Sequence, residues 1–455
     1  MANDLRLEIS DFRAIGNADI ILDGITVIAG ENGSGKSTIS KLLYHTFKVS
    51  KDFDIIIIEQ LKRKLQPVSS NLKSLMKEYS FLLNEKEEQV QRVNEIFYHS
   101  LSEMSDNDFS LELYITAIDE STELIKSIID DINNSDFVTR MMTMYNFRKG
   151  ENHAERIRKI LIDCLPINLR SDVESAELDG IIDYLKNYIK GIYEINAQLI
   201  EKRSVVELDN KLDRVFEKNS LKDNFKLYEH GIEVIDREYD RLMILNLVNE
   251  TVYIDTPMSI GLPNTGKNYH WDDLNKLLMV ESTSVHFDEL YHILPDQVMH
   301  GNVYFEKKDV YRNRFTFQRN DGTEFNLLEC ATGVKSFAIL QMLLKNGVLN
   351  EKTFLIIDEP EVHLHPQWIV EYARFLVVLN REFGVKMLVA SHSPDMVSAL
   401  KYITEKEGKP ENLNFYIAEP ISGSYQYNYK HLGIEIEDIF SSYNKSYDKL
   451  NDYTA

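Results

Sequence analysis

Gly30-Glu31-Asn32-Gly33-Ser34-Gly35-Lys36-Ser37 is the most informative stretch of this 455-residue chain. It follows the apolar run Ile25 to Ala29 and precedes the helix-like segment Thr38 to Phe47. A glycine, four residues, a second glycine, Lys and Ser, set between a strand and a helix, form a phosphate-binding loop. The alternative, a glycine-rich turn that binds nothing, leaves unexplained why every fixed position and both flanking elements agree.

The chemistry of this loop predicts ATP and Mg²⁺ as ligands. Glycines let successive N–H groups point at phosphate oxygens, and the following helix adds the positive end of its dipole. Lys36 is expected to reach the β- and γ-phosphates, and Ser37 to ligate Mg²⁺. The predicted nucleotide-binding residues of this region are Gly30, Glu31, Asn32, Gly33, Ser34, Gly35, Lys36, Ser37 and Thr38.

Composition restricts the class of protein. The hydrophobic content of 43% is enough for large cores, and the sequence shows neither a secretory leader nor an apolar run of membrane-spanning length. We therefore expect a cytoplasmic protein without a membrane partner. The only two cysteines, Cys164 and Cys330, favour neither a disulfide framework nor a zinc cluster.

The formal net charge of −22 argues against a protein whose whole surface coats nucleic acid. Local basic patches leave DNA contact open, although an ordinary solvated face is the simpler explanation of each. The candidate patches are Lys62-Arg63-Lys64, the run Arg140, Arg148, Lys149, Arg156, Arg158 and Lys159, and the group Lys307, Lys308, Arg312 and Arg314.

The spacing of apolar residues predicts an α/β fold, a mixed sheet flanked by helices, with a long all-helical insertion. Within the insertion, Leu72 to Leu101 and Ile192 to Leu245 are each expected to supply a long helix of a bundle or short antiparallel coiled coil. The expected segments are 1–61 and 246–420 for the two halves of the sheet domain, 62–245 for the insertion, and 421–455 for a C-terminal strand and acidic tail.

Two strand ends in the second half of the chain carry polar groups. Phe354 to Ile357 leads into Asp358-Glu359, and Val385 to Ala390 leads into Ser391-His392-Ser393-Pro394. Both runs are typical of buried parallel strands. Because strand, helix and strand imply a right-handed crossover, Asp358, Glu359 and His392 should lie side by side at one edge of the sheet.

These groups supply the roles that phosphoryl transfer to water requires. Asp358 would complete the coordination of Mg²⁺ together with Ser37, and Glu359 would polarise the attacking water. His392 would hydrogen-bond either the γ-phosphate or that water. Glu359 and His392 are therefore the predicted catalytic residues, and Ser37 and Asp358 are the predicted metal ligands.

Two further sets of residues stay undecided at this stage. His363 and His365 alternate, but a structural role is favoured because no third and fourth ligand follow at a spacing typical of metal sites. Gln60, Gln297 and Gln318 could each sense the γ-phosphate, and the sequence does not choose among them.

Five motifs occur in order along the chain: Ile9-Ser10-Asp11-Phe12-Arg13, the phosphate loop, Ala331-Thr332-Gly333-Val334-Lys335, Asp358-Glu359-Pro360-Glu361-Val362-His363-Leu364-His365-Pro366, and Ser391-His392-Ser393-Pro394. Together they resemble the ABC-type head of AAA family ATPases of the SMC, RecF and OLD kind, over about Leu5 to Phe53 and Thr251 to Ile417. The last two motifs are especially similar to the stand-alone ATPase subunits of bacterial antiphage systems such as Septu and PARIS.

The resemblance implies that two heads clamp ATP as a homodimer or higher homo-oligomer, the signature turn of one chain facing the phosphate loop of the other. It also implies nucleotide contacts from Arg13, Thr332, Gly333 and Lys335. Where the family usually has Ser before its signature glycine residues, this chain has Ala331. Slow or switch-like hydrolysis is therefore expected unless the hydroxyl of Thr332 substitutes.

Three function classes follow from the resemblance. The leading hypothesis is a sensor and regulator scaffold for a separate effector nuclease, of the HNH or TOPRIM type, in antiphage defence. The nuclease is expected on another chain because only about sixty residues follow His392, too few for a TOPRIM domain. The alternative is a DNA repair or recombination ATPase of the RecF or SMC kind, and a transporter ATPase subunit is the weakest candidate.

Overall fold

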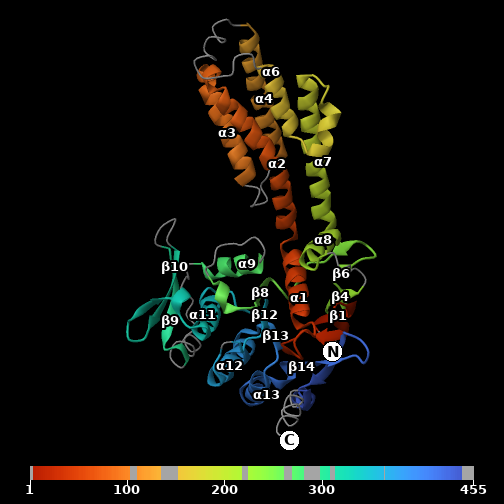
Figure 1. The fold of residues 1–455 in the computed structure, drawn as a ribbon, viewed down its shortest axis with the longest axis vertical. Coiled ribbons are helices and arrows are strands. Elements are labelled where there is room, and N and C mark those ends of the chain that lie inside the picture. Colours follow the sequence, from red (N-terminus) through yellow and green to blue (C-terminus); the bar gives the residue numbers. More distant parts are fainter. Residues whose placement is uncertain are drawn as a thin grey trace. The chain divides into compact units, whose positions relative to one another are not determined.

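The computed structural model of the protein describes residues 4–102, 110–134, 152–217, 224–260, 269–280, 298–307, 313–362 and 364–442. The chain forms two compact units. Unit 1 comprises Met1–Lys51 and Ser204–Ala455, and unit 2 comprises Asp52–Arg203. Figure 1 shows that unit 1 is a sheet with helices packed around it and that unit 2 is a bundle of helices.

A sheet of ten strands runs through the described part of unit 1. In spatial order the strands are β5 (Ile232–Glu233), β4 (Phe225–Glu229), β1 (Leu5–Phe12), β2 (Ile15–Ile21), β15 (Tyr427–Gly433), β14 (Leu413–Pro420), β3 (Ile25–Ala29), β13 (Lys386–Ser391), β12 (Thr353–Asp358) and β8 (Glu250–Ile254). The strands from β14 to β8 pair in parallel, whereas β5, β4, β1 and β2 pair in antiparallel fashion. The carboxyl ends of β3, β13 and β12 therefore meet at one edge.

The parallel strands lie at the centre of the core. Every residue of β3 and of β12 is buried, as expected for parallel strands covered by helices on both faces. This explains why their sequences are continuous apolar runs rather than alternating ones. Polar side chains can leave the core only where these strands end, which is where the candidate site lies.

One helix of unit 1 begins at a residue well suited to a helix N-terminus. Ser393 caps α13 (Pro394–Glu407), its side chain accepting a hydrogen bond from the Met396 N–H at 3.3 Å. The remaining elements of unit 1 are α1 (Lys36–Lys51), α8 (Val206–Val215), α9 (Tyr269–Leu278), α11 (Thr332–Lys345), α12 (Pro366–Phe383), the strands β6 (Ile235–Asp236), β7 (Arg241–Leu242), β9 (Gly301–Lys307), β10 (Asn313–Arg319) and β11 (Glu324–Asn326), and the short 3-10 turns η5 (Pro257–Ser259), η7 (Leu327–Glu329) and η8 (Pro410–Asn412).

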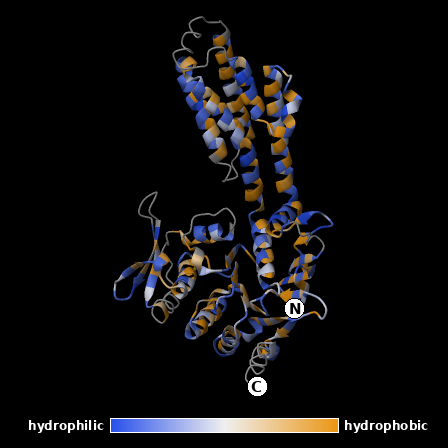
Figure 2. Cartoon of the chain, in the orientation of Figure 1, coloured by the Kyte–Doolittle hydropathy of each residue, from blue (hydrophilic) through white to orange (hydrophobic). Residues whose placement is uncertain are grey.

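Unit 2 has an apolar core of its own, built from the buried faces of its helices. Figure 2 shows hydrophobic and hydrophilic residues on each of these helices, as amphipathic packing requires. The helices are α2 (Phe53–Glu78), α3 (Glu87–Ser102), α4 (Leu111–Asn134), α6 (His153–Asp163) and α7 (Leu178–Lys202), with short 3-10 turns η1 (Ser80–Leu82), η2 (Asn84–Lys86) and η4 (Ile167–Val173). None of the described helices of either unit is long and apolar enough to cross a membrane.

The predicted fold class is confirmed: a mixed sheet flanked by helices carries a long helical insertion. Two predicted helices within the insertion are wrong. The helix expected over Leu72 to Leu101 is broken by 3-10 turns between α2 and α3. The helix expected over Ile192 to Leu245 ends at Lys202, where Arg203 adopts a left-handed conformation with φ of 53°.

The boundaries of the insertion also differ from the prediction, because the chain after Arg203 returns to the sheet domain. The compact helical unit spans Asp52–Arg203 rather than 62–245. Residues 225–229 form β4, which pairs with β1 and so belongs to the sheet of unit 1. Its alternation of buried Phe225, Leu227 and Glu229 with more exposed neighbours is a strand period that the longer helical pattern hid.

Candidate active site

The phosphate-binding loop connects β3 to α1 and has the backbone that its glycines predict. Gly33 and Gly35 have φ of +85° and +100°, a region that favours glycine. A Cβ on Gly35 would lie 2.9 Å from Cγ1 of Ile15, so a larger residue there would also collide with the sheet. The N–H groups of Thr38 and Ile39 donate to the Gly35 carbonyl, which starts the helix.

Lys36 lies folded against its own loop. Its side chain is buried, and Nζ donates to the carbonyls of Gly30 at 2.8 Å and Glu31 at 3.0 Å. Burial lowers the pKa of Lys36, while the nearby carboxylates of Glu359 and Asp358 oppose that shift. A cation held this way, at the start of a helix and beside the end of β12, is placed to meet phosphate oxygens.

Asp358 is a buried carboxylate at the end of β12. Its Oδ1 accepts a hydrogen bond from the Ser40 hydroxyl, and its Oδ2 accepts one from the Tyr253 hydroxyl at 2.8 Å. Burial raises the pKa of Asp358, and the hydrogen bonds from Ser40, Tyr253 and Ser37 counteract that rise. The structure thus brings together the two residues predicted to hold the metal.

The donor set of this site fits Mg²⁺. A hydroxyl and a carboxylate are hard oxygen ligands, and Mg²⁺ usually takes one or two protein ligands together with phosphate oxygens and waters. Ser37 is exposed at the start of α1, whereas Asp358 is 6% exposed. The described residues contain no cluster of three or more His, Cys, Asp or Glu side chains suited to a metal, which excludes an all-protein cage within them.

Glu359 and His392 lie beside each other at the same edge. β13 pairs with β3 on one side and β12 on the other, so residues following these strands become neighbours. Oε1 of Glu359 lies 3.7 Å from Nδ1 of His392, and the Glu359 N–H donates to the Ala390 carbonyl at 2.7 Å. Both side chains are 41% exposed, which leaves them accessible to a substrate and to water.

A family model described as the AAA ATPase domain matches residues 5–397. The chain belongs to this family. The predicted membership of the AAA family ATPases is therefore confirmed. No curated protein matches the sequence.

The chain also resembles SMC heads among solved structures, but the TM-scores are too low to bear on function. The Smc head domain with an extended coiled coil bound to the C-terminal domain of ScpA, from Pyrococcus furiosus, has a TM-score of 0.34 at 10% identity, covering 99% of both chains. The SmcHead bound to the C-winged helix domain of ScpA has a TM-score of 0.37 at 10% identity, covering 96% of this chain and 98% of that one. The SMC head domain from Thermotoga maritima scores 0.28 at 10% identity, covering 46% and 64%.

The signature-like turn, Ala331 to Lys335, lies at the start of α11 and contacts other parts of the chain. Thr332 Oγ1 lies 3.8 Å from Sδ of Met258, and Lys335 Nζ donates to the Leu328 carbonyl at 2.7 Å. A Cβ on Gly333 would lie 2.9 Å from the Trp368 ring. None of these contacts involves the phosphate loop.

Arg13 is also engaged away from the loop. Its Nη2 donates to the Phe216 carbonyl at 2.9 Å, and its guanidinium lies 4.9 Å from the centroid of the Phe216 ring. The φ of Arg13 is +52°. A nucleotide contact from Arg13, which the resemblance implies, stays a prediction.

The structure describes three of the five glutamines and histidines whose roles the sequence left undecided. Gln60 lies on α2 of unit 2, Gln318 donates to Glu324 at 3.4 Å on β10, and Gln297 is outside the described residues. His365 caps α12 by accepting from the Gln367 N–H, a structural role of the kind expected. His363 also lies outside the described residues.

The sequence analysis missed four residues that shape the site. Ser40 and Tyr253 hold Asp358, Glu361 lies under His392, and Tyr429 donates to the Ser34 carbonyl at 3.1 Å. They come from α1, β8, the turn after β12, and β15. Only Ser40 had a local signal, because it follows Lys36 by four residues and Ser37 by three on one helix face.

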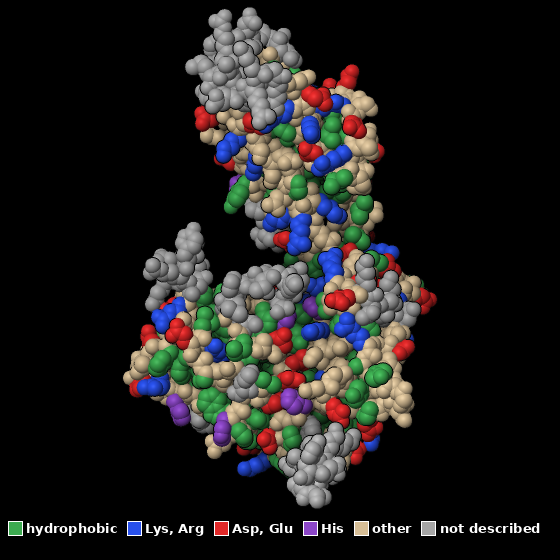
Figure 3. All heavy atoms as spheres, viewed as in Figure 1, with side chains coloured by type: hydrophobic (Ala, Val, Ile, Leu, Met, Phe, Trp, Pro, Cys, Tyr) green, Lys and Arg blue, Asp and Glu red, His purple; other side chains and the backbone are tan. Residues whose placement is uncertain are grey.

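The candidate basic patches contain several paired residues. Lys62 lies 4.0 Å from Glu59, and Arg156 lies 2.9 Å from Glu78. Arg140, Arg148, Lys149, Lys308 and Arg312 are outside the described residues. On the face drawn in Figure 3, Lys and Arg side chains are interspersed with Asp and Glu, as on an ordinary solvated surface.

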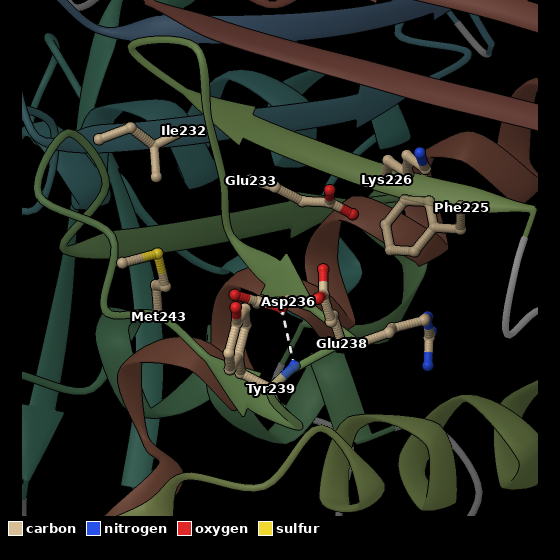
Figure 4. Close-up of a pocket in the computed structure, with 9 residues that line it drawn as sticks. Phe225, Lys226, Ile232, Glu233, Asp236, Glu238, Tyr239 and Met243 are labelled. Carbon is tan, nitrogen blue, oxygen red and sulfur yellow. Dashed lines mark hydrogen bonds between the residues drawn. The ribbon is translucent and has the colours of Figure 1, made fainter.

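A cavity away from the phosphate loop, in unit 1, is unsuited to phosphate. This cavity of about 580 Å³ is lined by Phe225, Lys226, Ile232, Glu233, Asp236, Arg237, Glu238, Tyr239 and Met243 (Figure 4). Its three acidic side chains outnumber its basic ones, and Arg237 is already bound by both oxygens of Asp209, at 2.9 and 3.0 Å. The phosphate loop remains the candidate site for a nucleotide.

Proposed function

We propose that this protein hydrolyses ATP to ADP and phosphate at the edge formed by β3, β13 and β12. The observation that carries the proposal is the convergence there of Lys36, Asp358 and Glu359. Lys36 and the loop N–H groups would bind the phosphates. When bound by Ser37 and Asp358, Mg²⁺ would neutralise charge on the phosphate oxygens.

Glu359 would act as the base. As the oxygen of water bonds to the γ-phosphorus, the bond from that phosphorus to the β–γ bridging oxygen breaks, and Glu359 takes the proton of the water. The side chain is sufficiently exposed to meet this water and stands next to the metal carboxylate. Its left-handed backbone, with φ of 50°, is a strained conformation of the kind that clusters at active sites.

The test is Glu359→Gln, which keeps the volume of the side chain and removes the base. We expect ATP to bind with unchanged affinity and turnover to fall by about 100-fold or more. Glu351→Gln is the matched control, because Glu351 is exposed at the opposite end of β12. Equal turnover of the Glu359 variant and the parent would exclude the assigned role.

We further propose that the site is shared between two chains, with the α11 turn of one facing the phosphate loop of its partner. The contacts of Thr332 and Lys335 with Met258 and Leu328, rather than with the phosphate loop, support this arrangement. A two-fold dimer would use each turn once and close.

The cellular role that we propose is regulation of a separate nuclease in antiphage defence. The support for this role is that the motifs after β12 and β13 resemble those of stand-alone ATPase subunits of antiphage systems. The geometry of the site does not bear on it. Purification of the protein expressed with the products of neighbouring genes tests it: a co-purifying nuclease supports the role. ATP-dependent DNA binding that weakens with salt, without such a partner, would favour a repair ATPase instead.

A further inference from the structure

The turn that follows β12 folds back beneath the end of β13. Glu359 starts the turn with its positive φ, and its carbonyl accepts from the Val362 N–H at 3.0 Å. Pro360 stands inside the turn and restricts it further. Two residues beyond Glu359, Glu361 is thereby directed toward the segment Ser391-His392.

Glu361 is a buried carboxylate with specific partners. Its side chain is 6% exposed, and its Oε1 accepts from the Ser391 hydroxyl and from the His392 N–H, both at 2.9 Å. The same oxygen lies 3.2 Å from Nδ1 of the His392 ring. Its Oε2 is buried without a hydrogen-bond partner among the described residues.

A purely structural role for Glu361 would not require a charge. An amide oxygen accepts hydrogen bonds from a hydroxyl and an N–H as well as a carboxylate oxygen does, and burying a charge is costly. What a carboxylate adds is attraction for a proton on the neighbouring imidazole. The charge of Glu361 also acts on Lys36, after those of Glu359 and Asp358, but the group that lies 3.2 Å from its Oε1 is the His392 ring.

The burial of the ring atoms supports this. Nδ1 of His392 is buried and makes no hydrogen bond with the described residues, and Glu361 Oε1 is the carboxylate oxygen closest to it, whereas the His392 side chain as a whole is 41% exposed. The inward nitrogen therefore faces Glu361, with Glu359 Oε1 further away at 3.7 Å. In a neutral imidazole a proton on one nitrogen leaves the other as an acceptor.

We propose that Glu361 is a positioning residue that keeps the neutral His392 imidazole protonated at Nδ1, so that Nε2 is a hydrogen-bond acceptor at the catalytic edge. Such a nitrogen accepts a hydrogen bond from water, whereas a γ-phosphate oxygen would need a donor. His392 in this form orients the attacking water for Glu359. The role in hydrolysis rests on the proposed function, but the tautomer does not.

The primary test measures the tautomer without any nucleotide. In protein with ¹⁵N-labelled histidine, at a pH where the imidazole is neutral, ¹⁵N chemical shifts show which ring nitrogen carries the proton. The signal of His392 among the 12 histidines is assigned by its loss in His392→Gln. We expect Nδ1–H in the parent protein. An Nε2–H form there would overturn the proposal, whatever the variants do.

Two variants separate Glu361 from its neighbour. Glu361→Gln keeps an oxygen for Ser391 and for the His392 N–H, and we expect it to shift the ring toward the Nε2–H form that free histidine prefers. Glu359→Gln should leave the tautomer unchanged. A shift in the Glu359 variant and none in the Glu361 variant would contradict the assignment.

Turnover then links the tautomer to chemistry. We expect Glu361→Gln to lower kcat about 10-fold or more with ATP affinity within about twofold of the parent, because a carboxylate that orients a histidine acts through that ring. An unchanged kcat with an altered tautomer would refute the positioning role. If the parent protein hydrolysed no ATP, the proposed function would fail while the tautomer result still stood.

Discussion

The N-termini of α1 and α11 look alike in sequence and differ in their surroundings. Each helix begins beside a glycine and carries a lysine whose Nζ is bound by backbone carbonyls. Gly33, within the loop before α1, has nothing within 4 Å of its missing side chain, whereas Gly35 is crowded by Ile15 and Gly333 by Trp368. Carboxylates act on Lys36, but the α11 turn is surrounded by Met258, Leu328 and Trp368.

This difference supports the proposed function, because of the two helices only α1 has, in the described part of the chain, strand ends with carboxylates beside its N-terminus. β13 lies beside the strand that carries the phosphate loop, and β12 follows next to β13, so the proposed metal ligand Asp358 and the proposed base Glu359 end up near the loop. The α11 turn has the hydroxyl of Thr332 at its first position, where we propose that it meets the nucleotide bound by the partner chain. Three experiments test this contrast.

The largest effect is expected from Lys36→Ala. Removing a charge that makes charge-assisted bonds to phosphate should weaken ATP binding by about 100-fold or more. The fold should persist, because water can take the place of the amine at two loop carbonyls. Calorimetric ATP titration and thermal unfolding measure both quantities, and Lys41→Ala, at an exposed position of the same helix, is the control. An ATP affinity equal to the parent's would show that Lys36 does not bind phosphate, and that the phosphate loop does not differ from the α11 turn in this respect.

A mixing experiment asks whether the two turns belong to one site. Thr332→Asp suits a helix N-terminus but would repel phosphate, and it avoids the crowding against Trp368 that any side chain at Gly333 meets. Lys36→Ala and Thr332→Asp homodimers should each be inactive. Random exchange should restore about a quarter of the parent's ATPase activity, since half the dimers are mixed and each has one intact site.

The control for this experiment is Thr332→Ser, which keeps the hydroxyl and should stay active in homodimers. Heterodimer formation is verified with two different affinity tags. Mixed dimers without any recovered activity would indicate that each chain carries a complete site.

The smallest effect is expected from Ala331→Ser. Ala331 precedes α11 with extended backbone and makes no side-chain cap hydrogen bond. A serine there should raise the free energy of unfolding by about 1 kcal/mol through capping. If the shared site is correct, the same hydroxyl should also speed turnover. A rise in stability with unchanged turnover would show that the hydroxyl stabilises α11 but takes no part in ATP hydrolysis.

The sequence was sufficient to predict the features whose signal is local. The turn of the phosphate loop and the buried strand before Asp358 each depend on neighbours within a few residues. Tyr253 and Glu361 could not be assigned their contacts, because those depend on β8 and β13 lying on either side of β12. Residues 225–229 were misassigned for the same reason: their partner strand, β1, lies more than 200 residues earlier.

The neighbours of β3 have a consequence for biosynthesis. The strand that carries the phosphate loop is complete at residue 29, yet it pairs with β13 and β14, whose residues are 386–391 and 413–420. On the ribosome, the nucleotide site therefore cannot assemble until nearly the whole chain has been translated, whereas Asp52–Arg203 emerges early with its own core and can fold first. Until then the apolar strand β3 remains unpaired, and nascent chains arrested before residue 386 should fail to retain ATP.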